Sequence, residues 1–397
     1  MKAVLKAVGK AVGYFFRTAD IFLLVLCLVC SAFGVALISS ASRAVSLATE
    51  SGGRVLTDIS ARTVTTQCVA IVIGVILFIL LSCVPLDLIT RFWKWILAFN
   101  ILFVLLLFTP WGSLRGGNRS WLDIPGFPIS IQPAEVVKVG FLLVLGRQIS
   151  SFTERERLNS LPSAVLLAAH LGLMIGVVFF PSRDVGMIVV YLMIFFFMCL
   201  AGGLKFRWFA IAGVGLAVAG PAIWLSSLLS EQQKNRLLYG FSPELDPLNV
   251  GYQPIKAKIA IGGGGLMGQG LFNGIQNMQG SPPEKHTDFI FCVAAEELGF
   301  VGCLIILLLL SVIIIRCLYV STRAKTQLAS VVCVGVAGML LFQTINNVGM
   351  NLALTPVIGL TLPFFSYGGS SIIATFAAMG LVSSAYRHPR THLLSDD

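Results

Sequence analysis

Three acidic residues are candidates for chemistry, because they occur where a polar segment gives way to an apolar one. Asp288 lies in the sequence Pro-Glu-Lys-His-Thr-Asp-Phe-Ile-Phe of residues 283–291, and Glu296 and Glu297 follow inside the apolar stretch. A carboxylate at membrane depth costs about 2.5 kcal/mol or more, so each of these acids needs a partner or a task. In a chain with only 18 acidic residues, this group is the first candidate for a reactive site.

The spacing of these acids predicts different roles for them. On one helix unbroken from Asp288, Glu296 would lie about 12 Å deeper and about 80° around, while Glu297 would face nearly the opposite side. We therefore expect Asp288 and Glu296 to line one cavity and Glu297 to pair elsewhere as a structural residue. Asp288 could instead cap the helix, but Thr287 would be an equally good cap and would leave Asp288 free.

A second polar group lies within residues 117–138. Pro133 suits the first turn of a helix, which places Glu135 and Lys138 three residues apart on one face. They could form an ion pair that only makes a polar helix end tolerable. Alternatively, Lys138 and Arg119 bind phosphate while Glu135 orients Lys138, because Arg offers a fork and Lys a point charge to phosphate oxygens. The residues alone leave both interpretations open.

Two glycine-rich segments are less specific. Residues 262–270 match neither the Walker nor the dinucleotide pattern, so a flexible turn is favoured. Residues 356–371 carry Pro and Gly within apolar sequence, and irregular backbone at membrane depth must be sheltered by protein or by a cavity. The alternative is a re-entrant turn with structural polar contacts from nearby asparagines. His286 has no second histidine nearby, so no zinc site is expected.

The elements that must position these residues are membrane helices. Of the 397 residues, 56% are hydrophobic and only 12% are charged, against about 25% charged in soluble domains. The sequence therefore predicts an all-α, polytopic integral membrane protein that forms one domain over residues 1–397. Stretches able to span the roughly 30 Å core of a bilayer occur at residues 20–41, 68–86, 93–111, 135–149, 163–181, 186–201, 207–229, 289–316, 328–354 and 366–386.

The distribution of Lys and Arg predicts the orientation of these ten transmembrane helices. With both termini inside, the inner segments hold 16 of these residues and the outer segments six, leaving aside the long segment 230–288. By the positive-inside rule both termini are then cytoplasmic. Residues 1–19 form a cytoplasmic N-terminal segment, and residues 230–288 form a large extracellular loop between the seventh and eighth helices. The basic residues that give the net charge of +10 are interpreted as determinants of membrane topology and as contacts to anionic lipids. No nucleic acid partner is expected.

Four motifs give the chain a resemblance to the SEDS family (shape, elongation, division and sporulation), typified by RodA, FtsW and SpoVE. They are Gln-Pro-Ala-Glu-x-x-Lys at 132–138, the Gly-Tyr-Gln and glycine pattern at 251–270, His-Thr-Asp-Phe-Ile-Phe with Glu-Glu-Leu-Gly at 286–299, and Leu-Pro-x-x-Ser-Tyr-Gly-Gly-Ser at 362–370. The match covers nearly the whole chain, and the short tails favour the RodA branch. One site departs from the family pattern, because residues 182–187 lack its Pro and its hydroxyl, which leaves the role of Asp184 open.

The resemblance implies a peptidoglycan glycosyltransferase that polymerises lipid II on the outer face of the bacterial cytoplasmic (inner) membrane, for cell elongation or division. It implies Asp288 as the catalytic base and Arg119 and Lys138 as cations for the pyrophosphate leaving group. The other substrate-binding residues that it implies are Gln132, Glu135, Glu296 and Ser366. A class B penicillin-binding protein, which is a transpeptidase, is the implied partner.

Two other functions use the same residues differently. A lipid II flippase would grip the pyrophosphate with the same cations and use Asp288 as a gate or structural acid. A scaffold would only recruit a transpeptidase. Only the enzyme would elongate glycan from labelled lipid II. A divalent cation, Mg²⁺ or Mn²⁺, could share the charge stabilisation in the enzyme, although the sequence shows no clear ligand set for it.

Overall fold

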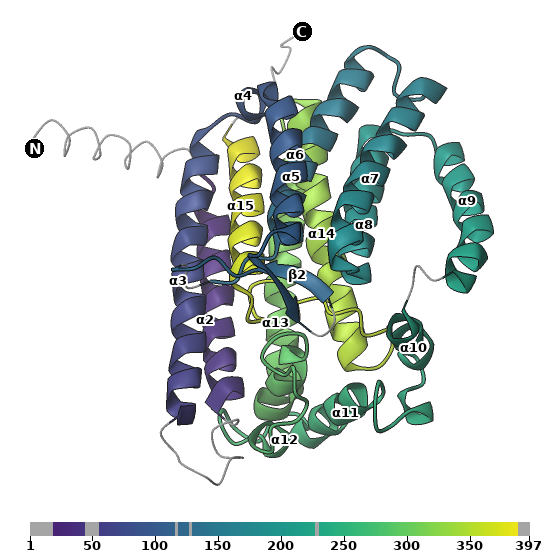
Figure 1. The fold of residues 1–397 in the computed structure, drawn as a ribbon. Coiled ribbons are helices and arrows are strands. Elements are labelled where there is room, and N and C mark those ends of the chain that lie inside the picture. The colour runs from purple at the N-terminus through teal and green to yellow at the C-terminus, as the bar shows by residue number, and fades with distance from the viewer. Residues whose placement is uncertain (1–18, 44–54, 116–117, 127–128, 227–229, 388–397) are drawn as a thin grey trace, which may run out of the picture.

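The computed structural model describes residues 19–43, 55–115, 118–126, 129–226 and 230–387 (Figure 1). The longer helices are α2 (Ile21–Arg43), α3 (Val55–Cys83), α5 (Trp93–Leu105), α6 (Pro133–Glu154), α7 (Leu161–Ser182), α8 (Val185–Gly202), α9 (Phe206–Leu225), α11 (Tyr252–Gly264), α13 (Ile290–Arg323), α14 (Gln327–Asn351) and α15 (Gly369–Tyr386). The short helices are α4 (Leu86–Arg91), α10 (Glu231–Tyr239), α12 (Ile275–Met278) and the 3₁₀ turns η2 (Leu106–Phe108) and η3 (Pro243–Leu245).

Within the described ranges, eight helices are long and apolar enough to cross a membrane, judged by length and composition. They are α2, α3, α6, α7, α8, α13, α14 and α15. Two shorter apolar stretches, Trp93–Phe108 and Phe206–Ala222, lie in the two remaining ranges that the sequence predicts as spans. The predicted fold class is therefore confirmed at the level of an all-α polytopic membrane protein.

A short antiparallel hairpin interrupts this helical pattern. β1 (Gly112–Arg115) pairs with β2 (Asn118–Leu122), and Ser113 lies opposite Trp121. The sequence does not predict these strands, because four or five residues are too few for an alternation of polar and apolar residues to show. A Gly-Gly dipeptide joins the two strands in the sequence, and it is a recognised hairpin signal.

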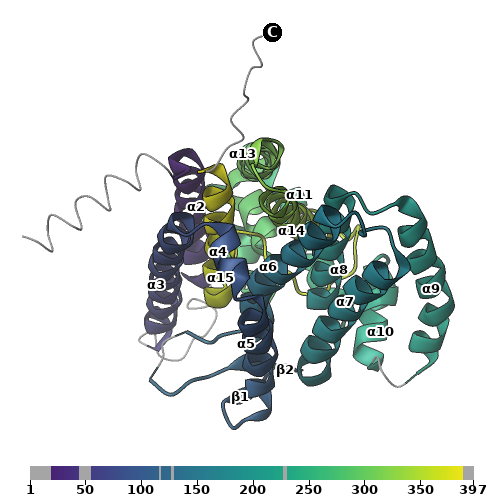
Figure 2. The ribbon, with the colours of Figure 1, turned by 90° about the horizontal axis from the view of Figure 1, so that it is seen from above.

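Helices α14 and α15 form the centre of the bundle, as both views show (Figure 1 and Figure 2). α15 packs against α3 and α6, and α14 packs against α13 and α8. In the apolar window of α15, 89% of the residues are buried, and in that of α14 72% are buried, against 33% for α7. The irregular segment 352–368 between α14 and α15 is therefore anchored at both ends in the most buried part of the protein.

Different segments of the chain lie at the two ends of the bundle. α10, α11 and α12 lie together at one end (Figure 1). At the other end, the Asp20 N–H donates to Ser383 Oγ at 3.0 Å, and the Asp20 carboxylate accepts a hydrogen bond from Arg316 at 2.8 Å. The start of α2 and the end of α15 thus lie at the same end, as an even number of membrane crossings requires.

Helix α13 does not run unbroken from Asp288, contrary to the expectation from its sequence. The helix begins at Ile290, and Phe289 occupies the N-cap position without a side-chain cap. The helix is also interrupted at Gly299, where φ is 67° and ψ is −166°, a conformation that is essentially restricted to glycine. The helical angles predicted from Asp288 therefore do not apply.

The glycine-rich segment 262–270 is fitted around this interruption, where a flexible turn was predicted. The Gln269 N–H donates to the carbonyl of Glu296 at 2.9 Å, and the Phe300 N–H donates to the carbonyl of Gly265 at 2.9 Å. These bonds satisfy backbone groups that the break in α13 leaves without helical partners. The glycine-rich segment thus supplies backbone partners to α13 at the position where its helical hydrogen bonds are interrupted.

Candidate active site

Two adjoining hollows lie at the end of the bundle that carries α10. The α6 hollow, of about 280 Å³, is lined by β2, the starts of α6 and α8, and segment 352–368. The α10 hollow, of about 570 Å³, is lined by α10, the residues before α11 and the same segment. The residues that line both hollows are Arg236, Glu284, Asp288 and Gly359. Asp288 therefore lies at their junction.

The irregular segment predicted at 356–371 does line this site. Its residues in the wall of the α6 hollow are Ile358, Gly359, Thr361, Tyr367, Gly368 and Ser371. Ser366, a predicted substrate-binding residue, does not line either hollow. It is buried, and its Oγ accepts a hydrogen bond from the Leu362 N–H at 2.8 Å. In this structure Ser366 therefore holds the turn that carries the lining residues.

Asp288 is placed for chemistry by its position two residues before α13. Thr287 does not cap the helix, whose N-cap position is held by Phe289; the Thr287 hydroxyl donates to the Glu284 carboxylate at 3.0 Å. The Asp288 side chain does not cap it either. Among the described residues, no hydrogen bond is made by the half-buried Asp288 carboxylate. It therefore faces the hollows with its acceptor capacity unused.

Burial raises the pKa of Asp288 to about 7. The negative charges of Glu284 and Asp184 also raise this pKa, whereas the positive charge of Arg236 lowers it. A carboxyl with a pKa near 7 is a suitable general base at neutral pH, because it is ionised in a large fraction of molecules and still binds a proton well. Perturbed values of this kind are typical of catalytic acids and bases.

Asp184, whose role the sequence left open, lies in the wall of the α6 hollow together with Gln132 and Glu135. Its carboxylate caps α8 by accepting from the Met187 N–H at 3.0 Å, and it also accepts from Gln132 Nε2 at 3.0 Å. Burial raises the pKa of Asp184 to about 6, against the lowering effect of the Met187 N–H. Asp184 therefore caps α8 although residues 182–187 depart from the family motif.

The two predicted phosphate-binding cations do not line either hollow. Lys138 is fully buried and forms an ion pair with Glu135, which was one of the two interpretations of their spacing. The Arg119 guanidinium donates to the backbone carbonyls of Gly112 at 3.2 Å and Thr109 at 3.3 Å. Lys138 thus balances the charge of Glu135, which lines the α6 hollow, and Arg119 stabilises the hairpin.

Glu296 also lies away from the hollows, whereas its spacing from Asp288 predicts that the two line one cavity at different depths. Its carboxylate accepts from the backbone N–H groups of Gln276 at 2.6 Å and Asn277 at 3.0 Å. Glu297 accepts from Asn277 Nδ2 at 2.7 Å and from Ser40 Oγ at 2.6 Å. Both acids therefore fasten the α12 segment to the bundle, whereas a structural role is predicted for Glu297 alone.

Two charged residues that line both hollows, Arg236 and Glu284, were not among the predicted site residues. Arg236 is exposed, and among the described residues it makes no hydrogen bond or ion pair; its charge acts on Asp288. It is carried by α10, which starts with a capping box formed by Ser230 and Gln233. That Ser-x-x-Gln signature could have revealed a helix in the long polar segment, but its distance from Asp288 depends on the tertiary fold.

No group of three or more His, Cys, Asp or Glu side chains in the described residues could hold a metal ion.

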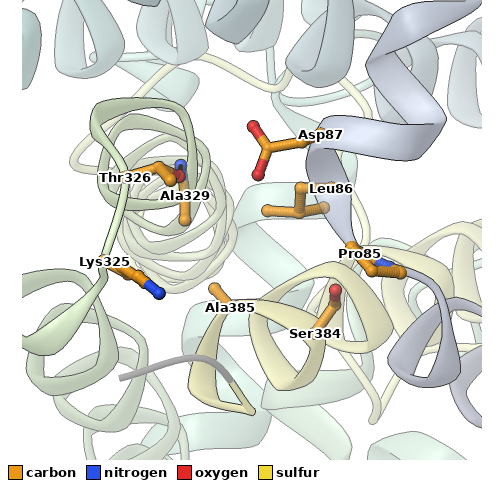
Figure 3. Close-up of a pocket in the computed structure, with 8 residues that line it drawn as sticks. All are labelled: Pro85, Leu86, Asp87, Lys325, Thr326, Ala329, Ser384 and Ala385. Atoms are coloured by element: carbon orange, nitrogen blue, oxygen red, sulfur yellow. Dashed lines mark hydrogen bonds between the residues drawn. The ribbon is translucent and has the colours of Figure 1, made fainter. Parts of the chain in front are cut away.

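A separate hollow of about 300 Å³ lies between the start of α4, the α13–α14 connection and the end of α15. Asp87 and Lys325 face it from opposite sides (Figure 3). This hollow adjoins the N-terminus of α14, whereas Asp288 contacts Asn351 at the C-terminus of the same helix. The two ends of a helix of 25 residues lie about 37 Å apart. The hollow is therefore remote from the candidate active site.

Sequence comparison identifies close relatives over most of the chain. A family model described as "Cell cycle protein", for FtsW, RodA and SpoVE, matches residues 20–391. The peptidoglycan glycosyltransferase MrdB of Escherichia coli (strain K12) is 33% identical over 318 residues, which cover 80% of this chain and 84% of that protein. Stage V sporulation protein E of Bacillus subtilis (strain 168) is 32% identical over 308 residues, covering 75% and 81%.

Solved structures share the fold. A chain in the structure of a peptidoglycan synthase complex, described in terms of coordinated polymerization and crosslinking, matches with a TM-score of 0.74 and 28% identity, covering 93% of this chain and 98% of that one. The crystal structure of the Thermus thermophilus rod shape determining protein RodA matches with a TM-score of 0.65 and 26% identity, covering 93% and 97%. The chain belongs to the FtsW/RodA/SpoVE family of cell cycle proteins.

Proposed function

We propose that this chain is a peptidoglycan glycosyltransferase that polymerises lipid II on the outer face of the bacterial cytoplasmic membrane. The observation that carries the proposal is the position of Asp288, with a pKa of about 7, at the junction of two hollows. Two binding spaces beside one base suit a reaction that joins two saccharides. The relatives named as peptidoglycan glycosyltransferases support the same activity.

In the proposed step, a sugar hydroxyl of one lipid-linked disaccharide attacks the anomeric carbon of a second lipid-linked chain. The Asp288 carboxylate accepts the hydroxyl proton while the new carbon–oxygen bond forms. The bond between the anomeric carbon and the pyrophosphate breaks, and undecaprenyl pyrophosphate leaves with the electron pair. The hollows separate the two substrates, so that each sugar reaches Asp288 from its own side.

Arg236 is our candidate for stabilising the charge that develops on the pyrophosphate. It lines both hollows and is exposed, whereas Lys138 is buried in its ion pair with Glu135. A guanidinium suits phosphate oxygens through paired hydrogen bonds, and fixed charges of this kind usually supply a large part of catalysis. Glu135 and Gln132, in the wall of the α6 hollow, remain candidates for substrate binding.

Orientation and partner complete the proposal. The distribution of Lys and Arg supports cytoplasmic termini, and the hollows lie at the opposite end of the bundle from Asp20 and Ser383. The long segment 230–288, which carries Arg236 and Glu284, is then the large extracellular loop of a single-domain protein. The structural match to a chain of a peptidoglycan synthase complex supports a class B penicillin-binding protein as the partner.

Purified protein incubated with labelled lipid II tests this function directly. The proposal expects glycan chains longer than the substrate, separated by gel electrophoresis, and release of undecaprenyl pyrophosphate. A flippase would move labelled lipid II between the leaflets of a liposome without elongating it. A scaffold would do neither, and either of these two results would overturn the enzymatic assignment.

A further inference from the structure

Two asparagines of α14 hold the main chain at Asp288. Asn347 and Asn351 lie one helical turn apart, and both side chains are fully buried. The Asp288 carbonyl accepts hydrogen bonds from Asn347 Nδ2 at 2.8 Å and from Asn351 Nδ2 at 3.2 Å. A single backbone carbonyl is therefore held by two side-chain amides of a neighbouring helix.

The contacts of Asn351 extend to the start of α13. Its Oδ1 accepts from the Cys292 N–H at 3.1 Å. This N–H belongs to the first turn, where the usual helical acceptor four residues earlier is missing, and it also donates to the Phe289 carbonyl at 3.1 Å. Phe289, at the N-cap position, supplies no side-chain cap. Asn351 thus takes the place of a cap for α13 and fastens the helix start, together with Asp288, to α14.

The contacts of Asn347 extend to the other wall of the site. Its Nδ2 also donates to the Leu360 carbonyl at 2.7 Å. Leu360 follows Gly359, where φ is 74° and where an added Cβ would lie 3.5 Å from Asp288 Oδ2. One amide group therefore ties Asp288 to the segment whose backbone faces the Asp288 carboxylate.

We propose that Asn347 and Asn351 are positioning residues that fix the Asp288 carboxylate at the geometry required for proton transfer. Neither side chain lines the α6 or the α10 hollow, so both act through Asp288 and through the segment around Gly359. The inference rests on the proposed function, in which Asp288 is the general base. A displacement of about 1 Å at a reacting group can cost about 100-fold in rate, which sets the scale of the effect.

A purely structural role is the competing explanation, and α14 itself provides a matched control. Asn346 is also buried on α14, but its Nδ2 has no hydrogen-bond partner among the described residues. Asn347→Leu removes the two donated bonds, while Asn346→Leu makes the same chemical change beside it without removing a bond from the amide nitrogen. The difference between the two variants therefore reports the contacts of Asn347.

The experiment measures kcat, KM and the pH profile of lipid II polymerisation, and the melting temperature, for purified full-length variants. We expect Asn347→Leu to lower kcat about 10- to 100-fold with KM changed less than about 2-fold, and Asn346→Leu to resemble the wild type. Relaxation of Asp288 into the open hollows should lower its raised pKa and move the acidic limb of the profile to lower pH.

An unmoved limb, with kcat falling only in proportion to the folded fraction, would overturn the proposal, as would equal losses in both leucine variants. If Asn347→Leu is not expressed as folded protein, Asn351→Ser is measured instead. This variant keeps the hydrogen bond from Asn347 to the Asp288 carbonyl, and the same fall in kcat and the same shift of the acidic limb are expected of it. Asp288→Asn is assayed in parallel. Full activity in that variant would refute the base assignment itself, whereas its inactivity beside a normal Asn347→Leu would refute only the positioning role.

Discussion

Charges of both signs surround Asp288, and they act on its pKa in opposite directions. Glu284 and Asp184 raise it, Arg236 lowers it, and burial makes the largest contribution, bringing the pKa to about 7. Glu284 and Arg236 both line the two hollows that meet at Asp288. The ionisation of the proposed base can therefore be shifted in either direction by changing a neighbour.

We expect kcat/KM for polymerisation to rise with pH through about 7, because Asp288 accepts a proton only in its ionised form and its pKa is about 7. Glu284→Gln removes a charge that raises the pKa, so the acidic limb should move to lower pH. Arg236→Gln removes a charge that lowers it, so the limb should move to higher pH. Shifts of about 0.5 to 1 unit are expected, and shifts in the same direction for both variants would refute the assignment.

The two arginines near the site should differ in what they contribute. Arg236→Gln should lower kcat/KM at the pH optimum by about 10- to 100-fold, since it removes a proposed charge partner of the leaving group. Arg119→Gln should lower the melting temperature while the folded protein keeps its turnover, because Arg119 donates to backbone carbonyls near the hairpin. Turnover and thermal melting of both variants decide the matter, and the reverse pattern would restore Arg119 as the phosphate-binding residue.

Residue types and spacing predicted part of this site. Asp288 was recognised from the cost of an acid at a membrane boundary. The spacing of Glu135 and Lys138 gave an ion pair as one of two interpretations, and the structure contains this pair. Spacing could not show that this pair is buried, nor that Arg236 approaches Asp288 from a segment about 50 residues earlier. These facts depend on tertiary packing, which local periodicity does not encode.

At the scale of single elements, the start of α13 at Ile290 explains why the position of Glu296 relative to Asp288 was predicted incorrectly. Asp288 precedes the first helical residue, so no helical angle relates it to Glu296, and α12 covers that acid with two backbone N–H groups. The glycine pattern at 262–270 was visible in the sequence, but the sequence did not show that this segment packs against α13. Glycine at Gly299 is required by a conformation that only the folded chain reveals.

The fit of the glycine-rich segment around α13 should be sensitive to a single methyl group. At Gly268 φ is 78°, and an added Cβ would lie 2.2 Å from the Glu297 carbonyl oxygen. Gly268→Ala should therefore lower the free energy of unfolding by about 1 to 3 kcal/mol, measured as a lower melting temperature in detergent. Gly262→Ala, in α11, has nothing within 4 Å of the added atom and should be neutral or stabilising. Equal melting temperatures would contradict the fit.

At the scale of the whole molecule, the chain forms a helical bundle with its reactive hollows at one end and the start of α2 and the end of α15 at the other. Hydropathy predicted the helices, because each apolar stretch must be long enough for a bilayer. Hydropathy does not rank the helices by burial, so the central place of α14 and α15 could not be predicted. That place explains why the connection between them carries so much of the site.

Thiol labelling of spheroplasts tests the predicted orientation. Leu248→Cys, in segment 230–288, and Asp87→Cys, in α4, each place a thiol at an exposed position. Both are made in a background in which serine replaces the exposed Cys68 and Cys83. We expect a membrane-impermeant reagent to label Leu248→Cys in intact spheroplasts and Asp87→Cys only after permeabilisation. The reverse pattern would place the hollows in the cytoplasm, where they could not act on an outer-face substrate.

The central claim is that Asp288 is the base of a glycan-polymerising enzyme, and one measurement tests it most directly. Purified wild-type protein and Asp288→Asn are compared for the rate of polymerisation of labelled lipid II, with binding of lipid II to each variant as the control. We predict that Asp288→Asn retains binding and loses about 10²- to 10⁴-fold in polymerisation rate. Polymerisation by Asp288→Asn at the wild-type rate would contradict the account.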